Sequence, residues 1–237
     1  MNPFENILDE AALDVLTAIG SSSLAGRFYL AGGTALALQT AHRRSIDLDF
    51  FQLGLQEKID LPAISGTIRK VLGSKRTIVE EKQPEQIMLR INGTRVTFLA
   101  YPFGLLEPLV TGETIDPHLH GISLAPVREI ALMKAYCLGR RAAFRDYIDL
   151  YFLLQKELVT LEYIITNAPR KFTLEGETLF SARLFLEQLV FFEDLPDRKA
   201  ALDMVPGRSL SEEAVKCFLA GKAREVLAQI GERGNDR

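Results

Sequence analysis

A short apolar run that ends in two glycines predicts a strand, a tight turn and a helix near the start of this chain. Residues 28–30 form the apolar run, and Gly32 and Gly33 follow it closely. Glycine tolerates positive φ angles and lets a ligand approach the backbone. A helix from Thr34 to Ala41 would add partial positive charge at the same turn, because its first N–H groups have no partner within the helix. The turn therefore favours an anionic ligand such as a polyphosphate.

Two aspartates, Asp47 and Asp49, follow this helix. Residues two apart in a strand point to the same face, so both carboxylates should converge on one spot. Two hard oxygen donors side by side suit Mg²⁺. Arg43, Arg44 and Ser45 precede the pair, and a guanidinium there can bind phosphate oxygens through two hydrogen bonds. Together, the turn and the aspartates predict a site for a phosphate and a metal ion.

Each of these motifs also has an ordinary explanation. A glycine pair after a strand occurs in many tight turns, and an Asp-X-Asp pair often lies on a solvated strand face. The arginines and the serine could belong to an exposed basic loop. An unrelated α+β domain with an incidental aspartate pair therefore stays open, and it predicts that Gly33 and Asp47 lie on opposite surfaces.

The composition indicates a folded protein. Of the 237 residues, 47% are hydrophobic, which is enough for a substantial core. The net charge of −3 gives no global attraction to nucleic acid or to an anionic membrane, so a nucleic-acid contact needs a local basic patch. No apolar run approaches the roughly 20 residues of a membrane span, and the first residues lack the pattern of a signal peptide. We therefore expect a cytoplasmic protein that does not enter the membrane.

The sequence patterns divide the chain into two halves. The first half mixes helices with strands, among them a hairpin at Asn92-Gly93, and helical periodicity dominates the second half. A segment rich in proline and glycine, residues 102–121, is the best candidate for the boundary, either as a flexible linker or as a packed surface loop. We therefore predict an α+β fold. A mixed sheet with flanking helices would occupy residues 1–121, and an all-helical domain would occupy residues 122–237.

A second group of charged residues lies in the helical half. Lys134 interrupts an apolar stretch, so its ammonium is either partly buried and directed at phosphates or carried to solvent by its aliphatic stem. Asp146 and Asp149 are three residues apart on a predicted helix and share a face. Arg145 and Asp149 are four residues apart and could simply pair. The residues alone leave these alternatives open.

Four segments occur in an order that resembles a known family. They are Ala31-Gly-Gly-Thr-Ala-Leu36, Arg44-Ser-Ile-Asp-Leu-Asp-Phe-Phe51, Lys134 and Arg145-Asp-Tyr-Ile-Asp-Leu150. Over roughly residues 28–155 the chain resembles the AbiEii/AbiGii toxin-family nucleotidyltransferases of bacteria, members of the polymerase-β-like superfamily. The resemblance implies a nucleotidyltransferase-like mixed sheet with flanking helices, followed by a helical domain that closes over a bound nucleotide.

The resemblance also implies roles for individual residues. It assigns NTP binding to the glycine turn and the basic loop, metal binding to the aspartate pair, and phosphate contact and acceptor activation to the helical half. The nucleotide-binding residues are Gly32, Gly33, Thr34, Arg44 and Ser45. The catalytic residues are Asp47 and Asp49, which would hold Mg²⁺, Lys134, which would contact phosphate, and Asp149, the helical acid.

One position departs from the pattern of the superfamily. Its enzymes commonly carry a third carboxylate on a later central strand, but the strand expected at residues 95–101 contains no acid, and Thr97 occupies the corresponding position. Glu80, Glu81 or Asp149 would then have to supply the acid, or transfer would be slow or lost.

The resemblance therefore leaves two functions. The first is Mg²⁺-dependent transfer of a nucleoside monophosphate from an NTP to a tRNA-like nucleic acid or to a protein, by the toxin component of a toxin–antitoxin or abortive-infection system with a cognate antitoxin. The alternative is a catalytically degenerate module of the same fold that binds nucleotides or a protein partner.

Overall fold

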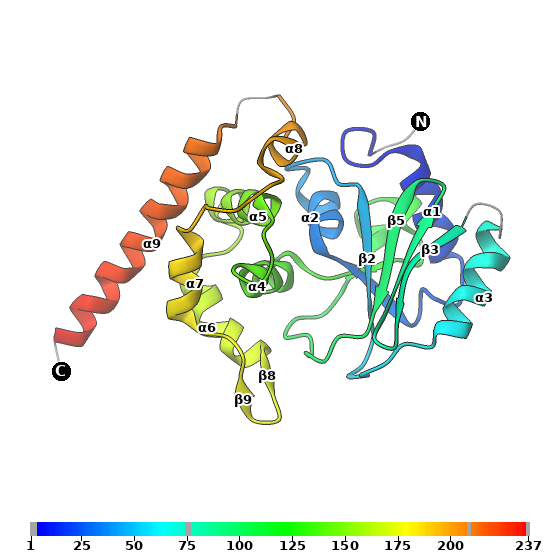
Figure 1. Ribbon diagram of the computed structural model, residues 1–237, viewed down its shortest axis with the longest axis horizontal. Helices are drawn as coiled ribbons and strands as arrows, with labels where there is room; N and C mark the ends of the chain where they lie inside the picture. Colours follow the sequence, from blue (N-terminus) through cyan, green and yellow to red (C-terminus); the bar gives the residue numbers. More distant parts are fainter. Residues whose placement is uncertain (1–3, 74–76, 208–209, 236–237) are drawn as a thin grey trace. The chain divides into compact units, whose positions relative to one another are not determined.

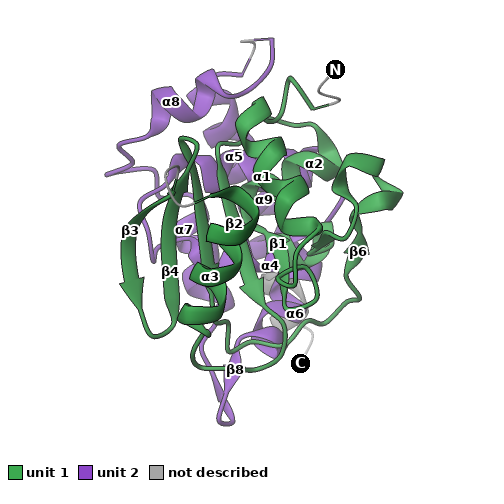
Figure 2. Cartoon of the chain, turned by 90° about the vertical axis from the view of Figure 1, so that its right-hand side faces the viewer, with its two compact units in different colours: residues 1–130 green, residues 131–237 purple. Residues whose placement is uncertain are grey.

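The chain divides into two units, residues 1–130 and residues 131–237, which Figure 2 distinguishes by colour. The structure is a computed structural model that describes residues 4–73, 77–207 and 210–235.

The first unit combines a mixed sheet with helices, and the strand, glycine turn, helix and second strand follow one another as predicted. In chain order its elements are α1 (Glu10–Gly20), β1 (Phe28–Ala31), α2 (Gly32–Thr40), β2 (Asp47–Gln52), α3 (Leu61–Leu72), β3 (Thr77–Gln83), β4 (Gln86–Ile91), β5 (Thr94–Leu99), β6 (Val110–Thr111), β7 (Ser123–Leu124) and the start of α4 (Val127–Cys137).

Seven strands of the described residues form one sheet in the order β3-β4-β5-β2-β1-β7-β6. β2 pairs antiparallel with β1 and parallel with β5. β3, β4 and β5 pair antiparallel in succession. The turn between β4 and β5 has φ angles of 51° at Asn92 and 91° at Gly93, and two positive values are those of the predicted type I′ hairpin turn. β2 therefore lies inside the sheet, with β1 on one side and β5 on the other.

Alternation along the central strands separates an apolar face from a polar face. Leu48, Phe50 and Phe98 are buried, and Phe50 stacks on Phe98 with ring centroids 5.2 Å apart. α1 and α3 lie on one side of the sheet, as both Figure 1 and Figure 2 show, and cover this apolar face. Asp47 and Asp49 take the alternate positions of β2 and are half-buried. The pleat of β2 therefore presents both carboxylates on one face.

The second unit consists mainly of helices. α5 packs on α8 and α9, and both α6 and α7 contact α9. After the remainder of α4, its elements are α5 (Phe144–Gln155), α6 (Leu161–Lys171), β8 (Thr173–Leu174), β9 (Glu177–Thr178), α7 (Ala182–Leu189), α8 (Arg198–Asp203) and α9 (Glu212–Asn235). Across the described ranges, no helix combines the length and the apolar composition that crossing a membrane requires.

The second half is mainly helical, with one short exception: β8 and β9 form an antiparallel hairpin after α6. The two units divide within α4, and the boundary predicted from the sequence lies at residue 121. Residues 102–121 belong to the first unit, where the N–H of Gly112 donates to the carbonyl oxygen of Ile122 at 2.7 Å.

Candidate functional site

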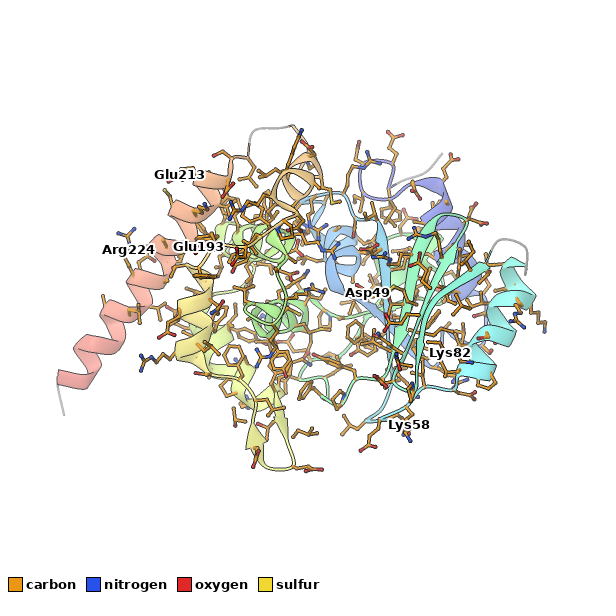
Figure 3. The ribbon with its side chains drawn as sticks, in the orientation of Figure 1. Asp49, Lys58, Lys82, Glu193, Glu213 and Arg224 are labelled. Atoms are coloured by element: carbon orange, nitrogen blue, oxygen red, sulfur yellow. The ribbon has the colours of Figure 1, made fainter. Side chains whose placement is uncertain are left out.

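The glycine turn lies directly against one of the two aspartates. Ala31, the last residue of β1, pairs in register with Asp49 on β2. Gly32 follows with a φ of +66°, a conformation that residues with a side chain rarely adopt, and a Cβ there would lie 2.8 Å from Asp49 Oδ2. The backbone that starts α2 therefore sits beside the carboxylate of Asp49, which projects from β2 (Figure 3). Gly32 is required both for the turn and for this close approach.

This geometry predicts that adding a single methyl group at residue 32 lowers the stability of the protein. We expect Gly32→Ala to destabilise the protein by roughly 1–2 kcal/mol, the cost of a left-handed conformation in a residue with a Cβ, and to displace the Asp49 carboxylate. Urea denaturation followed by circular dichroism measures the change. Gly66→Ala is the matched control, because a Cβ at Gly66 in α3 would meet nothing within 4 Å. That change should instead stabilise the helix by about 0.5–1 kcal/mol, and equal effects of the two variants would contradict the assignment.

A buried arginine lies at the same turn. The guanidinium of Arg43 contacts the Cα side of Gly33, where a Cβ would collide with Arg43 Nη2. Arg43 is only 2% exposed, and its Nη1 donates to the carbonyl oxygen of Arg44 at 2.8 Å. Arg44 itself is exposed. Of the two arginines of the predicted basic loop, Arg43 is therefore the one that lies beside the N-terminus of α2.

The burial pattern of this segment distinguishes the two arginines. Arg43 and Ser45 are buried, whereas Arg44 and Ile46 are exposed. Arg43 lies in a bend before β2, so the strand period that relates Asp47 to Asp49 does not extend to it. Its position beside Gly33 therefore depends on tertiary packing.

The hydroxyl groups of Thr34 and Ser45 join the helix to β2. Thr34 Oγ1 lies 2.6 Å from Ser45 Oγ, and the same hydroxyl donates to the carbonyl oxygen of Asp47. Both residues are buried. Their hydroxyl groups therefore fix the position of the first turn of α2 against the strand that carries the aspartates. Thr34 belongs to the first turn of α2.

The position of the expected third acid can now be located. Asp49 on β2 pairs in register with Thr97 on the neighbouring strand β5. Register partners share a face of the sheet, so the Thr97 side chain lies beside Asp49, where a third carboxylate would complete the group. Thr97 is buried. Across the described ranges, no group of three or more His, Cys, Asp or Glu residues could hold a metal ion.

A cluster of four charged side chains lies in the second unit. Lys134 Nζ lies 2.6 Å from Asp146 Oδ1 and 2.5 Å from Asp149 Oδ2, and the three side chains are at most 4% exposed. Arg141 binds Asp146 through two hydrogen bonds of 2.7 Å. α4 supplies the lysine and α5 supplies both aspartates. The spacing of three residues places both carboxylates of α5 on the side that faces Lys134.

The electrostatics of this cluster favour the ionised form of Asp146. Burial by itself would raise the pKa of the Asp146 carboxyl, but the Lys134 ammonium and the Arg141 guanidinium more than offset burial and hold the pKa below its usual value. Burial, with a smaller contribution from the Asp146 charge, also raises the pKa of Tyr147 to about 12. The Tyr147 hydroxyl donates toward the carbonyl oxygens of Gln188 and Phe191, at 3.0 Å and 2.7 Å.

These contacts exclude one of the two alternatives for Lys134. Its ammonium does not reach solvent along the stem, because Lys134 is 3% exposed and paired with two carboxylates. Asp149 pairs with Lys134 and is fully buried. The structure thus gathers the predicted residues into two groups, the glycine turn with the aspartate pair in the first unit and Lys134 with Asp149 in the second.

Comparisons with known proteins identify the family of this chain. A family model described as "Nucleotidyl transferase AbiEii toxin, Type IV TA system" matches residues 14–216. The uncharacterized protein aq_aa25 of Aquifex aeolicus (strain VF5) is 30% identical over 217 residues, which cover 90% of this chain and 95% of the relative.

Two solved structures share the fold. A protein from H. pylori described as a candidate nucleotidyltransferase superimposes with a TM-score of 0.56 at 13% identity, over 94% of each chain. JHP933 from Helicobacter pylori superimposes with a TM-score of 0.52 at 14% identity, over 97% of each chain. Because the family model spans most of the sequence, this chain belongs to the AbiEii nucleotidyltransferase toxin family.

Proposed function

We propose that this chain transfers a nucleoside monophosphate from an NTP to an acceptor hydroxyl, as the toxin of a toxin–antitoxin pair. The acceptor oxygen would attack the α-phosphorus, the bond from that phosphorus to the bridging oxygen would break, and pyrophosphate would leave. The proton of the attacking hydroxyl would pass to solvent. The observation that carries the proposal is the packing of Gly32 against Asp49, since it combines an anion-binding helix start with a metal-binding carboxylate.

The donor set fits a Mg²⁺ ion that enters together with the nucleotide. Asp47 and Asp49 supply oxygen donors from one face of β2. Mg²⁺ in nucleotide enzymes is typically bound by one or two carboxylates and by substrate phosphates, and it keeps several waters. A pair of carboxylates without a third acid therefore fits this ion. When bound, it would neutralise the charge that develops on the phosphates.

The protein groups around the turn would bind and orient the triphosphate. Gly33 and Thr34 present backbone N–H groups at the first turn of α2, where the helix dipole favours an anion. The Arg43 guanidinium lies against Gly33, and exposed Arg44 adds positive charge on the adjoining loop. Ser45 holds the turn in place through Thr34. Positioned phosphates are the main requirement of this chemistry, because the reaction needs little covalent participation by the protein.

The experiment is a transfer assay with the full chain. The purified protein is incubated with α-labelled NTPs, Mg²⁺ or Mn²⁺, total RNA and a protein extract. Label in RNA or in protein supports the proposal and identifies the acceptor class. Absence of label with every NTP and both metals overturns it. Calorimetry with NTP and Mg²⁺ measures binding separately from turnover.

Thr97 beside Asp49 favours a second candidate, a module that binds nucleotides without turnover. Transfer would require the missing acid for a two-metal site or for a general base. Tight NTP binding in calorimetry combined with no transfer is the result that this candidate predicts. Absence of both binding and transfer would point to a purely structural or partner-binding role.

The effect of Thr97 can be measured by restoring the acid. We expect Thr97→Asp to increase Mg²⁺-dependent transfer by about tenfold or more, because positioned general acid–base catalysis contributes about 10²–10⁴-fold and only part of it would return. The same transfer assay measures the change. Thr97→Val, which has the same shape and no acid, is the control and should not gain activity. An unchanged rate in Thr97→Asp would show that the side chain at this position does not limit transfer.

A further inference from the structure

A row of charged residues extends across the polar face of the sheet from the aspartate pair. Asp47 on β2 pairs in register with Arg95 on β5, and Arg95 pairs with Arg90 on β4. Register partners on neighbouring strands point to the same face, and such strands lie about 4.8 Å apart. The two guanidinium groups therefore share the face of Asp47. Their side chains are 40% exposed at Arg90 and 43% exposed at Arg95.

Glu80, at the irregularity of β3, joins the two arginines. It accepts hydrogen bonds from Arg90 Nε at 2.5 Å and from Arg95 Nε at 3.2 Å. Arg90 is tied further to the protein, because its Nη1 donates to the carbonyl oxygen of Gly93 at 3.2 Å. In the part of the chain that the structure describes, the side chain of Arg95 forms hydrogen bonds to protein only through its Nε. Arg90 and Glu80 thus position Arg95, whose two terminal nitrogens remain available to a ligand.

Arg95 lies on the side of the aspartates opposite to the glycine turn. In the sheet order, β1 with the start of α2 flanks β2 on one side, and β5 with Arg95 flanks it on the other. The proposed triphosphate site is at the start of α2. Phosphoryl transfer places the attacking and leaving oxygens roughly in line, so the acceptor must approach from the side away from the leaving pyrophosphate. On that side, Arg95 is the register neighbour of Asp47, and Arg90 lies one strand further away.

We propose that Arg95 binds the phosphodiester nearest to the terminal hydroxyl of a nucleic-acid acceptor, an inference that rests on the proposed function and names its acceptor class. A planar guanidinium matches phosphate oxygens with two parallel hydrogen bonds. In a nucleic acid, a phosphodiester lies within one nucleotide of the reacting hydroxyl, whereas a serine or tyrosine acceptor in a protein carries no such anion. With a net charge of −3, the chain needs a local cation for this contact, and Arg95 provides it.

The test separates acceptor binding from nucleotide binding. A fluorescein-labelled single-stranded RNA is titrated with the full-length protein at several salt concentrations and followed by anisotropy, and transfer to the same unlabelled RNA gives kcat and KM. Arg95→Ala should weaken RNA binding and raise the KM for RNA by about tenfold or more, the loss expected for a hydrogen bond to a charged group. The salt dependence, log K against log salt, should become shallower by roughly 0.7 for one lost phosphate contact. NTP binding measured by calorimetry should not change.

Two further variants keep the test specific. Arg69→Ala removes the same charge from the exposed surface of α3, which covers the opposite face of the sheet, and should leave RNA binding unchanged. Arg95→Lys keeps the charge without the planar fork and should restore the salt dependence but only part of the affinity.

Three results would overturn the inference while the proposed function stands. The first is that wild type and Arg95→Ala bind RNA equally and with equal salt dependence. The second is that Arg95→Ala binds NTP more weakly than wild type. The third is that the acceptor is a protein and that Arg95→Ala transfers to it at the wild-type rate. If the wild-type protein neither binds NTP nor transfers a nucleotide, that result would instead count against the proposed function itself.

Discussion

Replacing Asp49 by asparagine should lower the rate of nucleotidyl transfer by about 10³-fold, because metal stabilisation of developing charge is worth several kcal/mol and each 1.36 kcal/mol is a factor of ten. Asparagine keeps the shape of the side chain, so the backbone of Gly32 can still approach it. The variant loses one anionic donor at the point where the start of α2 meets β2. The transfer assay with a labelled NTP measures kcat/KM for both proteins.

The interpretation depends on comparison with other aspartates. Asp47→Asn should reduce transfer to a similar extent, and the double variant should be little worse than either single variant, since residues that act as a unit are not additive. Asp14→Asn removes an exposed carboxylate from α1 and should leave the rate unchanged. The free energy of unfolding should change by no more than about 0.5 kcal/mol in each variant. Full activity of Asp49→Asn would remove the aspartate pair from the mechanism.

The core of the candidate site could be predicted because its signals are local. The glycine pair determines the turn, and the alternation around Asp47 and Asp49 determines which face of β2 carries the carboxylates. The alternative of an incidental pair on the far surface from the turn is wrong, since Gly32 packs against Asp49. These features of the site could be predicted from residues that are close to one another in the sequence.

The sequence predicts less well those features that depend on tertiary packing. The sequence places both Arg43 and Arg44 in the basic loop, and only the packing of the folded chain shows that Arg43 is the buried one beside Gly33. The hairpin of β8 and β9 is too short for its period to be recognised in the sequence. The partners of Lys134 lie 12 and 15 residues away on another helix, and helical spacing relates only residues within one helix.

The charged cluster of the second unit gives the largest expected effect on stability. Lys134→Met should destabilise the protein by about 3–5 kcal/mol, the cost of leaving a buried charge without its partner. Asp149 is fully buried at 2.5 Å from Lys134 Nζ, so the substitution leaves its carboxylate without this ammonium. Urea denaturation measures the loss. Lys199→Met changes an exposed lysine of α8 and should stay within about 0.5 kcal/mol of wild type.

A double variant tests whether charge balance is the cause of that loss. Removing Lys134 together with Asp149, as Lys134→Met with Asp149→Asn, leaves Asp146 paired with Arg141. This variant should recover a large part of the stability that Lys134→Met loses, because neutralising both partners is far less costly than removing one. If the double variant is as unstable as the sum of the single variants, packing and not charge explains the effect.

Acid provides an independent check on the same cluster. The pKa of Asp146 is held below its ordinary value of 3.8 in the folded protein. A carboxyl with a lowered pKa contributes stability that is present above the ordinary value and is lost as the pH falls through the folded value. In Lys134→Met the strongest positive neighbour of Asp146 is absent, so protonation costs the variant less than it costs the wild type. The difference in unfolding free energy between the two proteins should therefore shrink as the pH falls below 3.8. A difference that stays constant across this range would assign the effect to packing of the Lys134 side chain.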